Sequence, residues 1–225
     1  MLTCRAMSTI SGFILVGGAS SRMGTDKAFL KLEGQTFIQR IARELSPLTS
    51  SITLVGRDNA SALSGATELA EPIDPKLPII ADVYERWGAL GGVHTALTAC
   101  QSGWALVVAC DLPFVTTPLF ARLAEMREDF DSVVPVQKDG RPQPLCALYA
   151  RTPCLHRAEE LIKSGERKPL GLLQSVRTRW VGFNELEDLT GANRFFDNVN
   201  TPQDYARAIE EGVSARDVVA QDRKG

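Results

Sequence analysis

Residues 11–27, SGFILVGGASSRMGTDK, decide the expected fold of this chain. The first part, Ser11–Gly17, is a short apolar run ending in glycine, which is typical of a buried strand that leads directly into a turn. The second part, Gly17–Lys27, is rich in small residues that let the backbone approach an anion and expose its N–H groups. Arg22 and Lys27 add positive charge there. We therefore predict a phosphate-binding loop after a buried strand.

This loop differs from two common nucleotide-binding motifs. It contains neither GxxxxGK[ST] nor GxGxxG, so it lacks the motifs of P-loop NTPases and of dinucleotide-binding proteins. A glycine-rich surface loop with ordinary charges is the alternative interpretation.

Further segments continue an alternation of strands and helices. Apolar runs predict strands at Ser51–Val55, Trp104–Ala109, Ser132–Val136 and Pro144–Tyr149. Helical spacing predicts helices at Thr36–Leu45, Gly91–Ala99, Thr117–Met126, Thr152–Ser164 and Pro202–Glu211, the last capped by Thr201. This order predicts a three-layer α/β/α fold with a mostly parallel sheet. We expect one domain over residues 1–225, with residues 1–10 and about 213–225 flexible.

Composition limits the classes of function. The chain has 225 residues, 44% hydrophobic and 23% charged, as in soluble globular proteins. Its net charge of −2 argues against a protein that coats nucleic acid, and it has no apolar stretch of the roughly 18 residues that cross a membrane. Five cysteines without a CxxC pair favour reduced thiols and a cytoplasmic location. With only two histidines, ligands for a structural zinc are scarce.

A candidate metal ligand follows the apolar run Trp104–Ala109. Asp111, in the sequence CDLP, would lie at the carboxyl end of a central strand beside the phosphate-binding loop. Mg²⁺ takes carboxylate and phosphate oxygens together, so Asp111 is placed to hold it. The alternative is a turn or a helix cap, although Thr116 and Thr117 already offer caps to the next helix.

Two other stretches are candidate binding segments. Asp82 and the glycine-rich turn that begins at Gly88 precede a helix, where a flat base or a sugar could lie against the backbone. His94, within that helix, is expected to pack rather than to catalyse. Asn198 and Asn200 are two residues apart, so in an extended segment both amides point to one side and could bind a polar ligand. A turn that caps the last helix is the alternative for the asparagines.

Four blocks of sequence together resemble a known family. Leu15–Lys27 is similar to the signature of nucleotidyltransferases with a Rossmann-like nucleotide-diphospho-sugar transferase fold. Its RMGxDK form, with CDLP, Gln143–Tyr149 (QPLCALY) and Asn198–Asp204 (NVNTPQD), resembles molybdenum cofactor guanylyltransferases. The blocks follow the family's order over nearly the whole chain. Val16 replaces the family's usual alanine and Ala89 its usual proline, and both changes are small and apolar.

The resemblance implies a reaction and its site. Family members join GMP from GTP to molybdopterin-bound molybdenum and release pyrophosphate. It implies Mg²⁺ on Asp111, catalysis by Arg22, Lys27 and Asp111, and pterin contacts from Asn198 and Asn200. The implied GTP contacts are Leu15, Val16, Gly17, Gly18, Lys27, Asp82, Gly88 and Asp111. It also implies an upstream cofactor-insertion enzyme and apo-molybdoenzymes as partners. The net charge and the apolar pattern already argue against nucleic acid and membrane as partners.

Two rival functions remain open. One is a cytidylyltransferase of the same fold that acts on this cofactor or on a sugar phosphate, although Gly18 and Asp26 favour the guanylyl form. The other is a non-catalytic nucleotide-binding adaptor. An adaptor would be expected to lose the metal carboxylate or the loop lysine, whereas this chain retains Asp111, Arg22 and Lys27.

Overall fold

The computed structural model describes residues 9–16, 30–56 and 77–210. In the described residues the main strands are β1 (Ile10–Leu15), β4 (Ser51–Val55), β5 (Ile79–Ile80), β6 (Trp104–Ala109), β7 (Ser132–Pro135), β8 (Cys146–Ala150) and β9 (Thr178–Val181). A small hairpin is formed by β2 (Lys31–Leu32) and β3 (Gln35–Thr36). The helices are α1 (Phe37–Leu45), α3 (Ala89–Ala99), α4 (Thr117–Glu125), α5 (Arg151–Lys163), α6 (Pro169–Ser175), the 3-10 turns η3 (Phe183–Glu185) and η4 (Ala192–Arg194), and a helix over residues 202–210.

The seven main strands form one sheet in the order β5-β4-β1-β6-β8-β7-β9. Neighbours pair in parallel at β5/β4, β4/β1, β1/β6 and β7/β9, whereas β8 is antiparallel to both β6 and β7. Within the described residues, therefore, β8 alone runs against the others. The α/β class and the mostly parallel sheet predicted from the sequence are confirmed.

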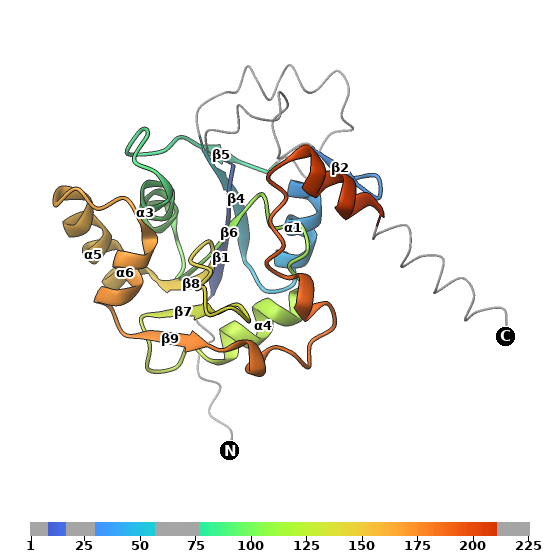
Figure 1. The fold of residues 1–225 in the computed structure, drawn as a ribbon. Coiled ribbons are helices and arrows are strands. Elements are labelled where there is room, and N and C mark those ends of the chain that lie inside the picture. Colours follow the sequence, from blue (N-terminus) through green and yellow to red (C-terminus); the bar gives the residue numbers. More distant parts are fainter. Residues whose placement is uncertain (1–8, 17–29, 57–76, 211–225) are drawn as a thin grey trace, which may run out of the picture.

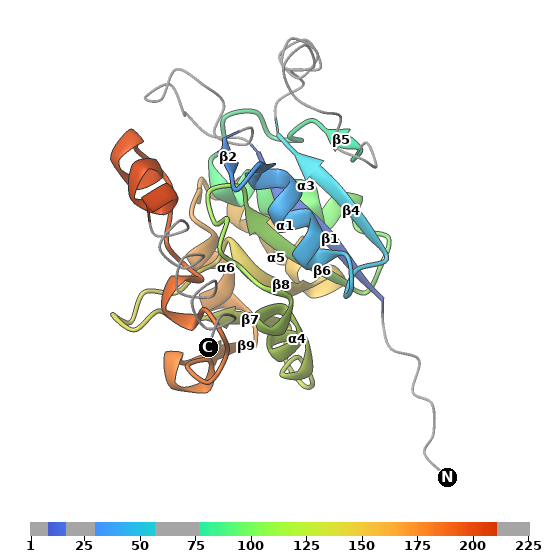
Figure 2. The same cartoon turned by 90° about the vertical axis from the view of Figure 1, so that its right-hand side faces the viewer.

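Helices cover both faces of this sheet, which gives three layers (Figure 1). In Figure 1 α3, α5 and α6 lie on one side of the strands and α1 and α4 on the other, and in Figure 2 α1 and α4 lie toward the viewer. Strand β6 shows why the central strands are apolar throughout. Leu106 and Val108 pack into the core under α1 and α4, whereas Ala105 and Val107 pack into the core under α3 and α5.

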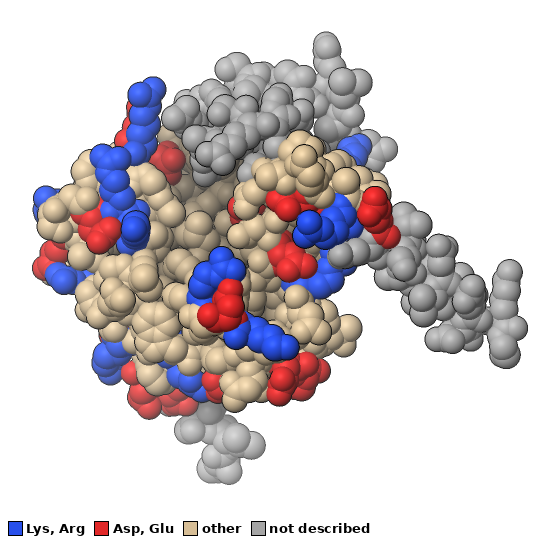
Figure 3. All heavy atoms as spheres, viewed as in Figure 1, with Lys and Arg blue, Asp and Glu red and all other residues tan. Residues whose placement is uncertain are grey.

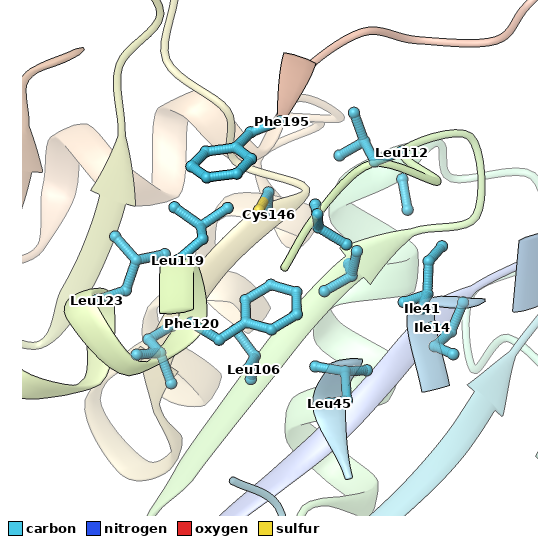
Figure 4. Packing of buried hydrophobic residues seen from close by; sticks show 14 of the residues in the cluster. Ile14, Ile41, Leu45, Leu106, Leu112, Leu119, Phe120, Leu123, Cys146 and Phe195 are labelled. Carbon is cyan, nitrogen blue, oxygen red and sulfur yellow. The ribbon is translucent and has the colours of Figure 1, made fainter. Parts of the chain in front are cut away.

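The core between the sheet and α1 and α4 is shown in Figure 4. There Ile41 of α1 and Phe120 of α4 belong to the same buried cluster as Ile14 and Leu106 of the sheet. Helix α1 begins where the sequence indicates, because Thr36 and Gln39 form a capping box with bonds of 3.2 and 2.8 Å.

Element boundaries agree with the sequence in most places. Strands β4 and β6 have the predicted limits, and β1 begins one residue early at Ile10. Ile10 is buried, so including it in a flexible N-terminal segment was wrong. Thr9 is described and exposed, and the rest of the predicted flexible ends, residues 1–8 and 213–225, lies outside the described residues.

Four of the five cysteines are described, and all four are free thiols. Burial raises the pKa of Cys146 and that of Cys154 to about 12. These two thiols therefore stay protonated and pack as small apolar groups.

Candidate active site

The carboxyl ends of β1, β4, β5 and β6 meet at one edge of the sheet. Backbone hydrogen bonds continue across that edge: Val16 N–H donates to Val55 (2.8 Å) and Gly56 N–H to Ile80 (3.1 Å). Cys110 N–H donates to Leu15 over 3.0 Å. In an open parallel sheet this is where ligands bind. The Leu15 carbonyl and the Val16 N–H are both hydrogen-bonded to neighbouring strands. A backbone contact from these residues to a nucleotide would therefore use other atoms.

Asp111 lies at this edge, in the turn that follows β6, and is partly buried. The turn is closed by Leu112 N–H, which donates to the Ala109 carbonyl over 3.2 Å. The Asp111 carbonyl accepts the N–H of Val199 over 3.0 Å. The structure thus joins the candidate metal ligand to the segment that carries the two asparagines.

The asparagine segment has the alternation expected of extended chain. Asn198 and Asn200 are exposed, and Val199 between them is buried at 2% exposure. Thr201 caps the helix over residues 202–210, as predicted, by accepting the N–H of Asp204 over 3.1 Å. The Asp204 carboxylate in turn accepts the N–H groups of Asn200 and Thr201 over 3.1 and 2.9 Å. The cap is therefore built from Thr201 and Asp204.

This last helix packs against the small hairpin rather than standing free. Val199 and Ala208 share a buried cluster with Leu32 and Phe37, and the Tyr205 hydroxyl donates to the Lys31 carbonyl over 2.6 Å. Figure 1 shows the chain passing α4 and α1 from β9 before it reaches this helix beside β2. These contacts hold the asparagine segment at the same edge as Asp111.

The cap predicted for α4 is different in the structure. Thr116 makes no side-chain cap, and the Thr117 N–H is instead bound by the Glu44 carboxylate over 2.9 Å. Burial raises the pKa of Glu44, but hydrogen bonds from Thr117 and the charge of Arg43 outweigh it, so the pKa is lowered overall. Glu44, at the end of α1, was not predicted because its partner is far away in sequence.

The turn between β5 and α3 brings Asp82 and Gly88 to the same edge. Gly88 has a φ of +74°, which favours glycine, and an added Cβ would lie 3.4 Å from the Arg167 carbonyl. A Cβ on Gly92 would lie 3.2 Å from the Leu15 side chain, so α3 packs closely on the end of β1. The N-terminus of α3 and its partial positive charge are therefore close to this end of the sheet.

His94 packs within this region, as expected. It is buried, its ring meets the Tyr84 ring edge-on at 5.0 Å, and its Nε2 is 3.9 Å from Glu159 Oε1, too long for a hydrogen bond. Burial lowers the pKa of His94, although the charge of Glu159 opposes the shift. A neutral packing side chain is the consequence at neutral pH.

Four predicted site residues, Gly17, Gly18, Arg22 and Lys27, lie outside the described residues. Conversely, the structure brings Trp87 and the segment 166–168 to the Gly88 turn, and sequence reasoning missed this contact. The only signal in the sequence was Trp87 next to Gly88, and nothing there indicated that Trp87 contacts the segment 166–168.

The described residues contain no group of three or more His, Cys, Asp and Glu side chains that could enclose a metal ion. Mg²⁺ often takes one or two carboxylates and completes its shell with water and substrate phosphates. A single partly exposed carboxylate such as Asp111 fits that kind of site. On the face seen in Figure 3, acidic and basic side chains are intermingled rather than separated by sign.

Comparison with protein families gives one match over most of the chain. The model described as MobA-like NTP transferase domain matches residues 12–178. Within the described residues, none of the helices has the length and apolarity to span a bilayer.

Individual relatives extend the match to the C-terminal segment. A protein of Pelotomaculum thermopropionicum named probable molybdenum cofactor guanylyltransferase is 31% identical over 90% of this chain and 93% of its own length. The solved structure of molybdopterin-guanine dinucleotide biosynthesis protein A from Archaeoglobus fulgidus has a TM-score of 0.73 and 27% identity, and covers 91% of this chain and 99% of that one. A 2-C-methyl-D-erythritol 4-phosphate cytidylyltransferase from Thermus thermophilus, 18% identical with a TM-score of 0.64 over 91% of this chain and 98% of its own, shares the fold.

Proposed function

Because the chain belongs to the MobA-like NTP transferase family, we propose that it transfers GMP from GTP to the molybdopterin-bound molybdenum cofactor. The products are pyrophosphate and the guanine dinucleotide form of the cofactor. The observation that carries the proposal is the hydrogen bond from Val199 to Asp111, because it joins the segment with Asn198 and Asn200 to the turn after β6.

The proposed roles of the residues come from the family resemblance, and the described residues among them lie along this edge of the sheet. Asp82 and Gly88, with the backbone of Leu15 and Val16, contact GTP. Asn198 and Asn200 expose two amides on one side of an extended segment and hydrogen-bond the polar pterin. Arg22 and Lys27 neutralise charge on the phosphates of GTP, with Gly17 and Gly18 offering backbone N–H groups.

The transfer needs positioning more than proton removal. A phosphate of the acceptor is already ionised near neutral pH, since its second pKa is about 6, so no side chain must act as a general base. Mg²⁺ supplies charge neutralisation between phosphate oxygens when bound. Asp111 would hold it, and the Asp111–Val199 contact keeps the backbone of Asp111 beside the asparagine segment.

A cytidylyl or sugar-phosphate transferase is the second candidate, favoured only by the shared fold of the Thermus thermophilus enzyme. Handover of the cofactor would need an upstream cofactor-insertion enzyme and apo-molybdoenzymes. We place the protein in the cytoplasm because the four described cysteines are free thiols, three of them buried.

The test is a thermal-shift titration with GTP, CTP, UTP and ATP, with and without Mg²⁺, followed by pyrophosphate release in the presence of molybdopterin-bound molybdenum. We expect a Mg²⁺-dependent shift for GTP alone and release that requires the acceptor. A preference for CTP or UTP would favour the second candidate, and no shift with any nucleotide would favour an adaptor.

The matched variants for this test are Lys27→Ala and Lys31→Ala. Lys27→Ala should lower kcat by about 100- to 1,000-fold if the lysine acts on transition-state charge. Lys31 is exposed on β2 and uses only its carbonyl toward Tyr205, so its substitution should leave kcat unchanged.

A further inference from the structure

The segment from Asp82 to Gly88 forms neither helix nor strand, although Tyr84 and Trp87 within it pack against the core. It forms turns between β5 and α3, and the Val83 side chain within it is 54% exposed. Arg86 adopts a φ of +56°, which is unfavourable for a residue other than glycine, and Gly88 a φ of +74°. The conformation of such a segment depends in part on contacts with the elements around it.

One contact comes from Thr95, in the second turn of α3, the helix that begins after Gly88. Its hydroxyl accepts the Val83 N–H over 2.9 Å and donates to the Gly91 carbonyl over 3.0 Å. Thr95 is buried at 2% exposure. The hydroxyl thus links the backbone next to Asp82 to helix α3. Removing the hydroxyl would leave the Val83 N–H without this acceptor.

A second contact holds the other end, at Trp87. The Trp87 indole N–H donates to the Glu166 carbonyl over 2.8 Å, and the Arg167 guanidinium lies 4.8 Å from the centre of the Trp87 ring. The neighbouring Leu90 N–H donates to the Arg167 carbonyl over 3.2 Å. The loop before α6 therefore holds the residue that precedes Gly88.

We infer that Thr95 and Trp87 are positioning residues for the nucleotide, because together they hold Asp82 and Gly88 from both ends of one segment. This inference rests on the proposed function, which puts Asp82 and Gly88 in contact with GTP. We assign neither residue a contact with the reacting phosphates. When either contact is lost, the segment becomes ordered only when GTP binds. The entropic cost of that ordering weakens the affinity for GTP and leaves the chemical step unchanged.

The test compares Thr95→Val with Thr95→Ser. Valine keeps the shape and removes the hydroxyl, whereas serine keeps the hydroxyl. We expect Thr95→Val to raise the KM for GTP about fivefold, the size of one lost hydrogen bond, with kcat unchanged within about twofold. Thr95→Ser should restore the KM of the unaltered protein.

The second pair is Trp87→Phe and Trp180→Phe. Trp87→Phe removes the indole N–H and keeps an aromatic ring, and it should raise the KM for GTP by a similar factor. Trp180 is exposed on β9 at the far edge of the sheet, so the same change there should leave the KM unchanged.

Hydrogen exchange of residues 80–90 gives a measurement that needs no nucleotide. Thr95→Val and Trp87→Phe should speed exchange in this segment, and Thr95→Ser and Trp180→Phe should not. A lower melting temperature with unchanged KM for GTP and unchanged exchange would overturn the inference, since it describes a purely structural role. If the unaltered protein binds no GTP, the proposed function is refuted. Faster exchange in Thr95→Val and Trp87→Phe alone would still show that these two side chains hold the segment.

Discussion

Val199 donates its backbone N–H to the carbonyl oxygen of Asp111 over 3.0 Å. A second contact joins the same two segments, because the Arg194 guanidinium lies 3.9 Å from the centre of the Phe114 ring. The turn after β6 and the C-terminal segment therefore behave as one unit at the carboxyl edge of the sheet. A substitution in either segment can therefore act in two ways. It can break the contacts between the segments, or it can remove a functional side chain and leave those contacts in place.

Asp111→Asn tests the proposed metal ligand. The amide keeps the size of the side chain and the Val199 contact, which uses only backbone atoms, but it weakens binding of a hard cation. We expect Mg²⁺-dependent GMP transfer to fall at least about 100-fold, with the melting temperature little changed.

The matched control for Asp111→Asn is Asp188→Asn, which makes the same change in an exposed ion pair with Arg122. It should retain full transfer activity. Full activity in Asp111→Asn, measured over a Mg²⁺ titration, would remove the metal assignment.

Asn198→Ala and Asn200→Ala test the proposed acceptor-binding segment. Both side chains are exposed, so the free energy of unfolding should change by less than about 0.5 kcal/mol. We expect each variant to raise the KM for the molybdopterin substrate about fivefold, by the loss of a hydrogen bond, and to leave the KM for GTP unchanged.

Asn193→Ala, at an exposed position of η4, is the control for the two asparagines. If the KM for GTP rose together with the KM for the acceptor, the asparagines would be acting on the shape of the site rather than on the pterin.

Phe120→Ala tests the core between the sheet and α4. Phe120 is completely buried and belongs to the cluster shown in Figure 4. Removing the ring should lower the free energy of unfolding by about 3–5 kcal/mol, measured by urea denaturation. Ile209→Ala, at an exposed position of the last helix, should change it by less than about 0.5 kcal/mol. A small loss at Phe120 would mean that the core relaxes around the missing ring.

Glu44 should make stability depend on pH in the acidic range. Its pKa lies below the ordinary value of 4.5, so the folded state favours the carboxylate. This contribution is complete above the unfolded pKa and is lost as the pH falls through the lower folded pKa. Glu44→Gln should therefore flatten the decline of the melting temperature below pH 4.5, and Glu210→Gln, which is exposed, should not. Equal slopes in all three proteins would contradict the assignment.

Local sequence was enough for the elements that carry their own pattern. Trp104–Ala109 is apolar at every position because both faces of β6 are covered, and its limits were predicted correctly. The Thr201 cap was also predicted, since its hydroxyl lies within three residues of the N–H that it binds. The Thr36 cap is equally local, but only the start of its helix was predicted. The position of Asp111 was predicted as well, because it follows the end of the apolar run that forms β6.

Other features depend on residues far apart in the chain. Nothing in Cys146–Ala150 shows that β8 runs against its neighbours, because strand direction is set by the path of the connecting chain. Strand β5 has two residues and exists only because β4 lies beside it. The contacts of Val199 with Asp111, Trp87 with Glu166 and Glu44 with Thr117 likewise join segments that meet only when the layers pack. The periodicity of apolar side chains indicates which face of a helix or strand is buried. The contacts between distant segments depend on which other element packs against that face.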